Sequence, residues 1–397
     1  KDPHTSVDLK NSGITGSAIK LKSSSDEIRD NNTFIFIDDN LFGSRKLLSL
    51  EISRNSDGYV NAAKLTHPFY RLSEDSAWSV SLLEHRFEEP IFDAGIISGA
   101  TGNDVRQAEF SYGWLHHLGN DDATRFRLGW NYSATDYFNN VTFPATSLPR
   151  YLATSQPDAS VKSFPYFQYE YVLNKYIVRS NFLVMGAPED IALGDHLSIV
   201  AGWQDELFNS TENGLIFSIN YSFGSQFSDR ALGLFDLELN REVNESDFDP
   251  IHFSFSSKLF LFIDNNNSYQ FSTGVELSRD AIVQERFFLG GDSGLKGYPV
   301  RFQNGNRKVT FGLEKRTYFE WYPLQMLKLG FATFAELGSA WDDGVDPILL
   351  SDVGFGLRLV STRQTDSKVL ALDLAFPASE RDQVDSYQLF LKAQSQF

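Results

Sequence analysis

The 397-residue chain contains no cysteine, which excludes disulfide frameworks and thiol chemistry. It has no run close to the ~18–20 consecutive apolar residues that a membrane-spanning helix needs, and its mean hydropathy is -0.28. Basic residues are few: 35 Lys and Arg stand against 52 Asp and Glu, so the net charge of -17 argues against nucleic acid as a partner. A soluble chain of this length would divide into two or three domains, whereas an all-β barrel can use it as one.

Catalytic and metal-binding motifs are also missing from the sequence. The segment 291–294 reads Gly-Asp-Ser-Gly, like the nucleophile loop of chymotrypsin-like proteases, but Leu295 follows it where those proteases have glycine. The seven histidines form no metal-binding motif, and the adjacent His116 and His117 would point to opposite faces of a strand. Acidic pairs such as 342–343 are typical of solvated loops, with a divalent ion at the level of lipopolysaccharide as the alternative. We therefore expect no enzyme, no metal site and no cofactor.

Aromatic residues are abundant: they make up 14% of the chain, with 35 Phe and 16 Tyr. Large apolar residues recur with period two, as in 370–376, where the even positions are apolar and the odd positions are small or charged. This alternation fits the inward face of a soluble sandwich or the lipid-facing side of a transmembrane barrel. The number of such segments, their polar or glycine-rich second face and the terminal Phe397 favour the barrel.

Nineteen segments carry this strand pattern. They are 16–23, 32–39, 45–54, 59–67, 78–87, 105–115, 123–136, 165–174, 176–186, 196–207, 214–224, 229–240, 250–262, 268–278, 307–318, 326–337, 352–360, 368–376 and 386–397. Turn residues support several of the joints between them. The longer polar connections at 88–104, 137–164 and 279–306 suit the extracellular side of a barrel, since periplasmic turns are short.

One glycine-dense stretch, 287–298, is followed by five of these strands and carries the tip Leu295-Lys296-Gly297-Tyr298. This order resembles the BamA/TamA-type outer-membrane assembly-factor superfamily, which includes the two-partner-secretion translocators. In that family an extracellular loop folds into the barrel and carries an arginine where this chain has Lys296. Other segments that resemble family turns and strands are 39–43, 67–70, 205–214, 312–314, 334–338 and 354–356.

The resemblance implies an all-β fold: an antiparallel transmembrane β-barrel of 16 strands. The polar segment 1–15 would precede a barrel at 16–397, and the loop at 279–306 would fold into the lumen. Because sixteen is fewer than nineteen, a short hairpin within 165–240 is expected to project beyond the membrane. An eighteen-stranded barrel would contradict that treatment of 165–240.

The resemblance also implies a loop motif and a charge pair. The loop motif comprises Gly290, Gly291, Leu295, Lys296, Gly297 and Tyr298. The family pairs its loop arginine with an aspartate, and the corresponding pair in this chain is Lys296 with Glu336, with Glu314 on the same strand face. Lysine lacks the bidentate fork of arginine, so we expect a looser geometry. The alternative is that Lys296 is a solvated loop lysine.

The last segment, 386–397, looks like an outer-membrane targeting strand. Its outward row would be Tyr387, Leu389 and Leu391, and it ends on the aromatic Phe397. The alternative is an ordinary edge strand. Family members usually carry POTRA modules before the barrel; only about fifteen residues stand there in this sequence, so such modules were either removed or never present.

The function implied by the resemblance is insertion or translocation of proteins, or of lipids, at the bacterial outer membrane. First and last strands that pair poorly would leave a seam whose backbone can template an incoming strand, and the residues of 16–23 offer few side-chain contacts. Expected partners are outer-membrane lipid and lipopolysaccharide, a client outer-membrane or secreted protein, and a periplasmic or lipoprotein partner. The alternatives are a passive porin and a structural barrel that scaffolds a partner protein.

Overall fold

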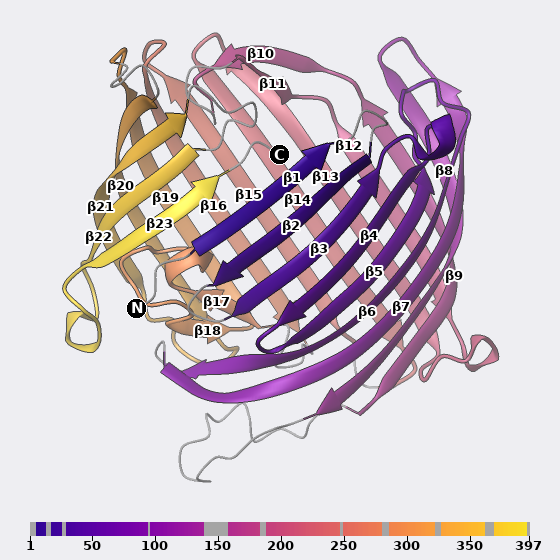
Figure 1. Cartoon of the computed structure of the whole chain (residues 1–397). Coiled ribbons are helices and arrows are strands. Elements are labelled where there is room, and N and C mark those ends of the chain that lie inside the picture. Colours follow the sequence, from indigo (N-terminus) through magenta and orange to yellow (C-terminus); the bar gives the residue numbers. More distant parts are fainter. Residues whose placement is uncertain are drawn as a thin grey trace.

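The structure, a computed structural model, is built almost entirely from antiparallel strands (Figure 1). It describes residues 5–12, 17–25, 29–93, 96–138, 158–182, 188–246, 249–279, 286–321, 327–361 and 369–394. Among these residues no helix has the length and apolar content needed to cross a membrane.

The main sheet has nineteen strands. Its first nine are β1 (Thr5–Ser12), β2 (Ser17–Ser25), β3 (Asp30–Asp38), β4 (Leu47–Asn55), β5 (Gly58–His67), β6 (Ser76–Asp93), β7 (Ile96–Leu118), β8 (Asp122–Phe138) and β9 (Ser160–Leu173). The remaining ten are β12 (His196–Gln204), β13 (Gly214–Ser228), β14 (Ala231–Asn244), β15 (Ile251–Phe262), β16 (Asn267–Arg279), β19 (Arg307–Tyr318), β20 (Leu327–Trp341), β21 (Leu350–Ser361), β22 (Val369–Pro377) and β23 (Gln388–Gln394). Short 3-10 turns occupy Leu41–Gly43, Glu206–Phe208, Gly291–Ser293 and Arg381–Gln383.

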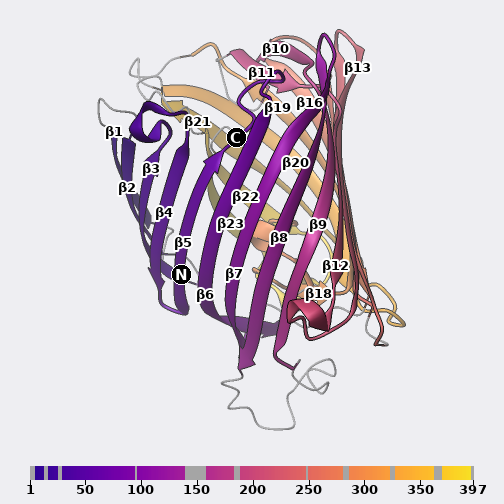
Figure 2. The same ribbon diagram turned by 90° about the vertical axis from the view of Figure 1, so that its right-hand side faces the viewer.

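Each strand of the main sheet pairs with the next one in an antiparallel meander, with β9 followed directly by β12. Two small hairpins lie outside this sheet: β10 (Tyr176–Ser180) with β11 (Pro188–Ala192), and β17 (Phe287–Leu289) with β18 (Gln303–Gly305). Both views place the β10–β11 hairpin and the β17–β18 hairpin at opposite ends of the molecule (Figures 1 and 2). Since strands of a meander alternate in direction, the connections β6–β7, β8–β9 and β16–β19 all leave the sheet at the β17–β18 end.

The exposure of the side chains follows the two-residue period of the strands. In β20, Ala332, Phe334 and Gly338 are buried, whereas Thr333 and Leu337 are exposed. Exposed large apolar residues of this kind recur from strand to strand and form the outer surface of the sheet, as in Leu82, Phe110, Leu128, Phe167, Phe217, Leu259, Phe271, Phe311, Phe355, Leu370 and Leu389. The polar, small and charged residues of the same strands face inward, which is the alternation of a transmembrane barrel.

The sheet does not close among the described residues, because no pairing joins β23 to β1 or β2. Figure 1 shows the sheet curling so that its two edge strands come to the same side of the molecule. Since nineteen is an odd number, β1 and β23 run in the same direction, and a direct pairing between them would be parallel. The strand that runs antiparallel to β23 is β2. The sequence predicts closure of the strand 16–23, which is β2, onto 386–397; no pairing between β2 and β23 occurs among the described residues, so this closure is not present.

The strand count differs from the sixteen that the sequence analysis expects. Eighteen of the nineteen patterned segments enter the main sheet, because each has its own outward apolar row. Within 165–240 the structure has one hairpin outside the main sheet, β10–β11, but it removes only one candidate strand, and its side chains pack against the inner face of β14 and β15. The nineteenth strand, β1, lies inside the polar segment 1–15, which the sequence predicts to precede the barrel. Its only apolar residues are Val7 and Leu9, too few to indicate a strand.

Candidate functional site

The described part of the connection between β16 and β19 folds into an inward loop (residues 286–306) with an apolar core of its own. Leu289, Leu295, Tyr298 and Phe302 pack with Leu350 from the wall, and each of them is almost completely buried. Leu295 has a positive φ of 62°, a conformation that costs free energy for a branched residue. The burial of the Leu295 side chain in this core stabilises the strained backbone conformation. The apolar core therefore fixes the shape of the loop tip independently of its charged contacts.

Lys296 stands at the tip of the loop and contacts Glu336 of β20 twice. Its Nζ lies 2.8 Å from Glu336 Oε1, and its backbone N–H donates to Glu336 Oε2 at 2.9 Å. The ammonium group also lies 3.8 Å from the centre of the Phe334 ring. The structure thus brings the loop lysine to the carboxylate that the sequence analysis selected. The second oxygen is bound by the backbone, which supplies the bidentate contact that lysine alone cannot make.

The next two residues of the tip are bound just as closely. The Gly297 N–H donates to Asp352 Oδ2 at 2.6 Å, and a Cβ on Gly297 would lie 2.7 Å from Asp352 Cβ. Only glycine permits this approach of the loop backbone to β21. The Tyr298 hydroxyl lies 2.9 Å from the carbonyl oxygens of both Ser351 and Ser379, so it ties the loop to the start of β21 and to the β22–β23 connection.

A chain of ion pairs crosses the lumen wall beside the loop tip. Lys296 Nζ lies 3.7 Å from Asp373 Oδ2, Asp373 binds Arg358, and Arg358 lies 3.2 Å from Glu314 Oε2. Glu314 in turn binds Arg316. We call these residues the lumen ion chain: Glu336, Lys296, Asp373, Arg358, Glu314 and Arg316. Glu314, which the sequence analysis placed near Lys296, belongs to the same chain but has the two arginines as its direct partners.

The lumen ion chain lines a cavity of about 240 Å³ between the loop and the wall. Phe390 and Lys392 of β23 line it as well, so the cavity borders the edge strand of the sheet. Cations and carboxylates alternate along its wall and neutralise one another. The cavity is therefore a charged space with no excess of one sign, as is typical of a polar barrel interior.

The loop also contacts parts of the wall far from its tip. Arg301 donates to the carbonyl oxygen of Pro90 in β6 at 3.4 Å, and its guanidinium lies over the ring of Phe288. At the loop base Arg286 binds Asp342 through both carboxylate oxygens at 2.6 Å. The loop is therefore attached to the wall at three places: at its base through Arg286, at its tip through Lys296, and at β6 through Arg301.

β23 lies within the segment 386–397, for which a targeting role stays a prediction, and it carries an outward apolar row. Leu389 and Leu391 are exposed, Tyr387 lies just before the strand and is also exposed, and Phe390 faces the cavity. Phe397 lies outside the described residues. The outer edge of β23, like that of β1, makes no backbone pairing within the described part of the chain.

Three residues of the site were not found by sequence reasoning. Asp352 lies directly opposite Glu336 in the β20–β21 ladder, and Asp373 lies opposite Gly356, whose missing side chain gives the carboxylate room. A signal for Asp373 was available, since it is the one charged residue on the inner face of 370–376. No sequence pattern indicated Ser379, because only the folded β22–β23 connection brings its carbonyl oxygen to the Tyr298 hydroxyl. No cluster of three potential metal ligands occurs among the described residues.

Comparisons with known proteins identify the fold. Neither the family models nor the curated proteins searched match this chain. Among solved structures, BamA from Haemophilus ducreyi lacking POTRA domains 1-3 superimposes with a TM-score of 0.55 at 12% identity, covering 99% of this chain and 75% of that one. CdiB from Escherichia coli superimposes with a TM-score of 0.52 at 12% identity, covering 98% of this chain and 61% of that one. The chain has the fold of these outer-membrane barrels, as its sequence motifs predict.

Proposed function

We propose that this protein is an integral outer-membrane barrel that assists insertion or translocation of other proteins through its seam, the gap between β23 and the N-terminal strands. The observation that carries the proposal is the pair of unpaired edges within a BamA-like fold. An exposed strand edge is a row of free N–H and C=O groups that can bind an incoming extended segment. A client outer-membrane or secreted protein supplies such a segment as it folds.

The anchored loop supports this function over a passive porin. A porin needs an open, water-filled lumen, whereas this interior holds an anchored loop with its own apolar core. Single-channel recording in planar bilayers separates the two functions. We expect small, irregular currents, and large steady open-state currents would favour the porin.

The remaining partners follow from the surfaces of the barrel. The outward apolar rows would contact outer-membrane lipid and lipopolysaccharide. The end that carries the inward loop would face the cell exterior, since long connections belong on that side. The opposite end would face the periplasm, where a client or a lipoprotein partner would arrive.

Crosslinking of the seam tests the proposal. Because the chain has no cysteine of its own, single cysteines can be placed in β1 or β2 and in β23 and joined by a short bifunctional reagent. The assay is the folding of a small outer-membrane barrel, diluted from urea, into vesicles that contain the protein. We expect crosslinked protein to lose its acceleration of client folding.

A matched control is a crosslink between Asn220 and Glu238, which lie opposite each other in β13 and β14, away from the seam. This crosslink should leave client folding unchanged. Equal activity of the seam-crosslinked and control proteins would refute the seam mechanism and favour a scaffold.

A further inference from the structure

The lumen face of the sheet carries an unexpected apolar patch at the end opposite the inward loop. Leu232 and Leu234 of β14 and Phe260 and Phe262 of β15 form this lumen patch, on the inward face where the same strands otherwise carry polar residues. Phe260 is only 3% exposed. If nothing covered these side chains they would be exposed to the water of the barrel lumen, which costs free energy in proportion to their exposed apolar area.

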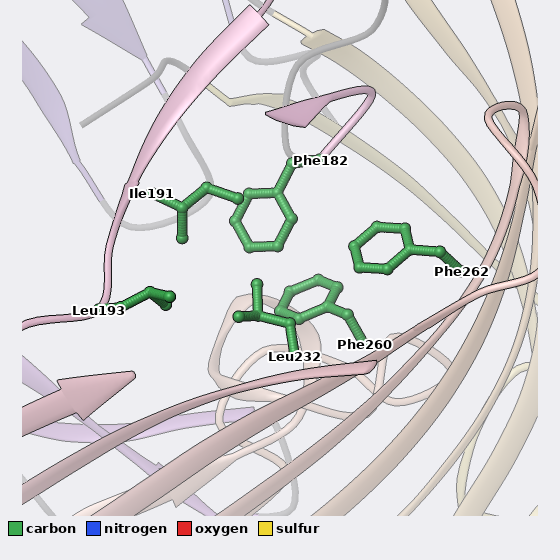
Figure 3. Close-up of a cluster of buried hydrophobic side chains, with 6 residues drawn as sticks. All are labelled: Phe182, Ile191, Leu193, Leu232, Phe260 and Phe262. Carbon is green, nitrogen blue, oxygen red and sulfur yellow. The ribbon is translucent and has the colours of Figure 1, made fainter. Parts of the chain in front are cut away.

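The β10–β11 hairpin covers this patch. Phe182, which follows β10, lies with its ring 4.4 Å from that of Phe260, and Ile191 and Leu193 pack beside it (Figure 3). Gly224 of β13 allows the backbone at Leu193 to pack closely against the wall, since a Cβ on Gly224 would lie only 2.9 Å from Leu193 Cα. One face of the hairpin therefore completes an apolar core with the wall.

Polar contacts fix the hairpin across the rim of the sheet. Arg179 donates to the carbonyl oxygen of Asp229 in the β13–β14 turn at 2.9 Å, and its guanidinium lies 3.6 Å from the centre of the Phe262 ring. Asn181 donates to the carbonyl oxygen of Asn265 in the β15–β16 turn at 2.8 Å. The hairpin thus bridges two turns and points Phe182 inward.

The hairpin also touches the lumen ion chain. Arg316, the last member of that chain, donates to the carbonyl oxygen of Phe182 at 3.3 Å. Through Glu314, Arg358 and Asp373 the contacts then continue to Lys296 at the tip of the inward loop. A continuous series of charged contacts therefore joins an element at one end of the lumen to an element from the other end.

We propose that the β10–β11 hairpin is a second, displaceable plug that covers the lumen from the end opposite the inward loop, and that the lumen ion chain couples the two. Arg358 is shared between Asp373 and Glu314, and Arg316 is shared between Glu314 and the carbonyl oxygen of Phe182, so a change at one end alters which group each guanidinium binds along the series. Release of either plug then weakens the other. The coupling concerns the barrel itself and stands whether or not the barrel handles client proteins.

Hydrogen exchange of the whole protein in vesicles tests the plug. Phe182→Ala should raise the exchange rate of amides in 176–180 and 188–192 at least about tenfold, the change that ~1.4 kcal/mol of lost contact gives. Arg179→Met, which keeps the apolar stem and removes the rim contact, is a second variant and should act in the same direction. Unchanged exchange of the hairpin in both variants would show that it is not held by these contacts.

The coupling is tested at the far end of the chain. Lys296→Ala should also speed exchange in the hairpin, although no hydrogen bond or ion pair among the described residues joins Lys296 directly to the hairpin. The matched control is Lys308→Ala: Lys308 lies on the same face of β19 as Glu314 and Arg316 and binds Glu276 at 2.8 Å. No contact among the described residues joins that pair to the lumen ion chain. If Lys296→Ala and Lys308→Ala affect the hairpin equally, the two plugs are not coupled.

Discussion

At the residue scale, the inward loop depends on three consecutive positions that use different chemistry. Lys296 uses charge, Gly297 uses the absence of a side chain, and Tyr298 uses a buried hydroxyl. Sequence reasoning reaches Lys296 and its partner Glu336 because the family resemblance pairs this loop position with an acidic residue at the position of Glu336. It does not reach Asp352, because which carboxylate meets Gly297 depends on the register of β20 with β21.

Removal of the charge at the loop tip should destabilise the protein. Lys296→Ala leaves Glu336 and Asp373 without their shared cation, and we expect a loss of roughly 1–3 kcal/mol, below the ~3–5 kcal/mol of a fully buried pair. Lys296→Arg should be mild. The measurement is the temperature at which the folded band is lost in heat-modifiability gels, with the outward Lys315→Ala as control. An effect of Lys296→Ala no larger than that of the control would mean that the pair does not hold the loop.

Gly297 gives a steric prediction. In Gly297→Ala the new methyl group would lie 2.7 Å from Asp352 Cβ and 3.1 Å from Pro377 N, so the loop tip must move away from the wall. We expect a loss of about 1–3 kcal/mol in urea titrations. The control is Gly312→Ala, where the close neighbour is the hydroxyl of Ser272, which can rotate. Equal stability of the two variants would contradict the close fit of the tip.

At the element scale, the period-two pattern finds eighteen of the nineteen strands of the main sheet, misses β1, and does not show which patterned segment stays outside the sheet. Eighteen of the nineteen patterned segments enter the main sheet, more than the sixteen expected, because a strand with one lipid-facing row has a clear apolar alternation in its sequence. The described strand of the segment 176–186 is β10, which has the same residue types but pairs with β11 outside the main sheet. Phe182, which follows β10, packs against Phe260 and Phe262 on the inner face of β15. Those two aromatics broke the polar pattern of their face, which was the available signal for a covering element.

The outward rows give a prediction for single strands. Phe355→Lys puts a charge on the outer face of β21, and a lysine near the bilayer midplane costs about 2–4 kcal/mol. The inward Ser256→Lys in β15 should be tolerated, since its side chain meets the wet interior. Urea titration of folding into lipid vesicles measures both. If Phe355→Lys folds as well as Ser256→Lys, the exposed apolar face does not contact lipid.

At the scale of the whole molecule, the strand number decides how the barrel can close. The sixteen strands expected came from the family resemblance, whereas the main sheet has nineteen strands: eighteen of the patterned segments, and β1, which the pattern did not indicate. An odd meander leaves β1 and β23 running in the same direction, so an antiparallel closure needs β2 in place of β1. The pairing between the terminal strands is thus less constrained than any other in the barrel, and this seam is where we propose that client strands bind.

Capture of an incoming strand at the seam is the measurement that tests the central claim most directly. Single cysteines at Phe390, Leu391 and Lys392 of β23 would be oxidised against single cysteines in the last strand of a client barrel during its folding into vesicles. The account predicts that the yield of the disulfide alternates between high and low from one position of β23 to the next, with the two-residue period of a paired strand. Disulfides formed only with lumen-facing cysteines such as one at Ser256, or none at β23 while the client still folds faster, would contradict it.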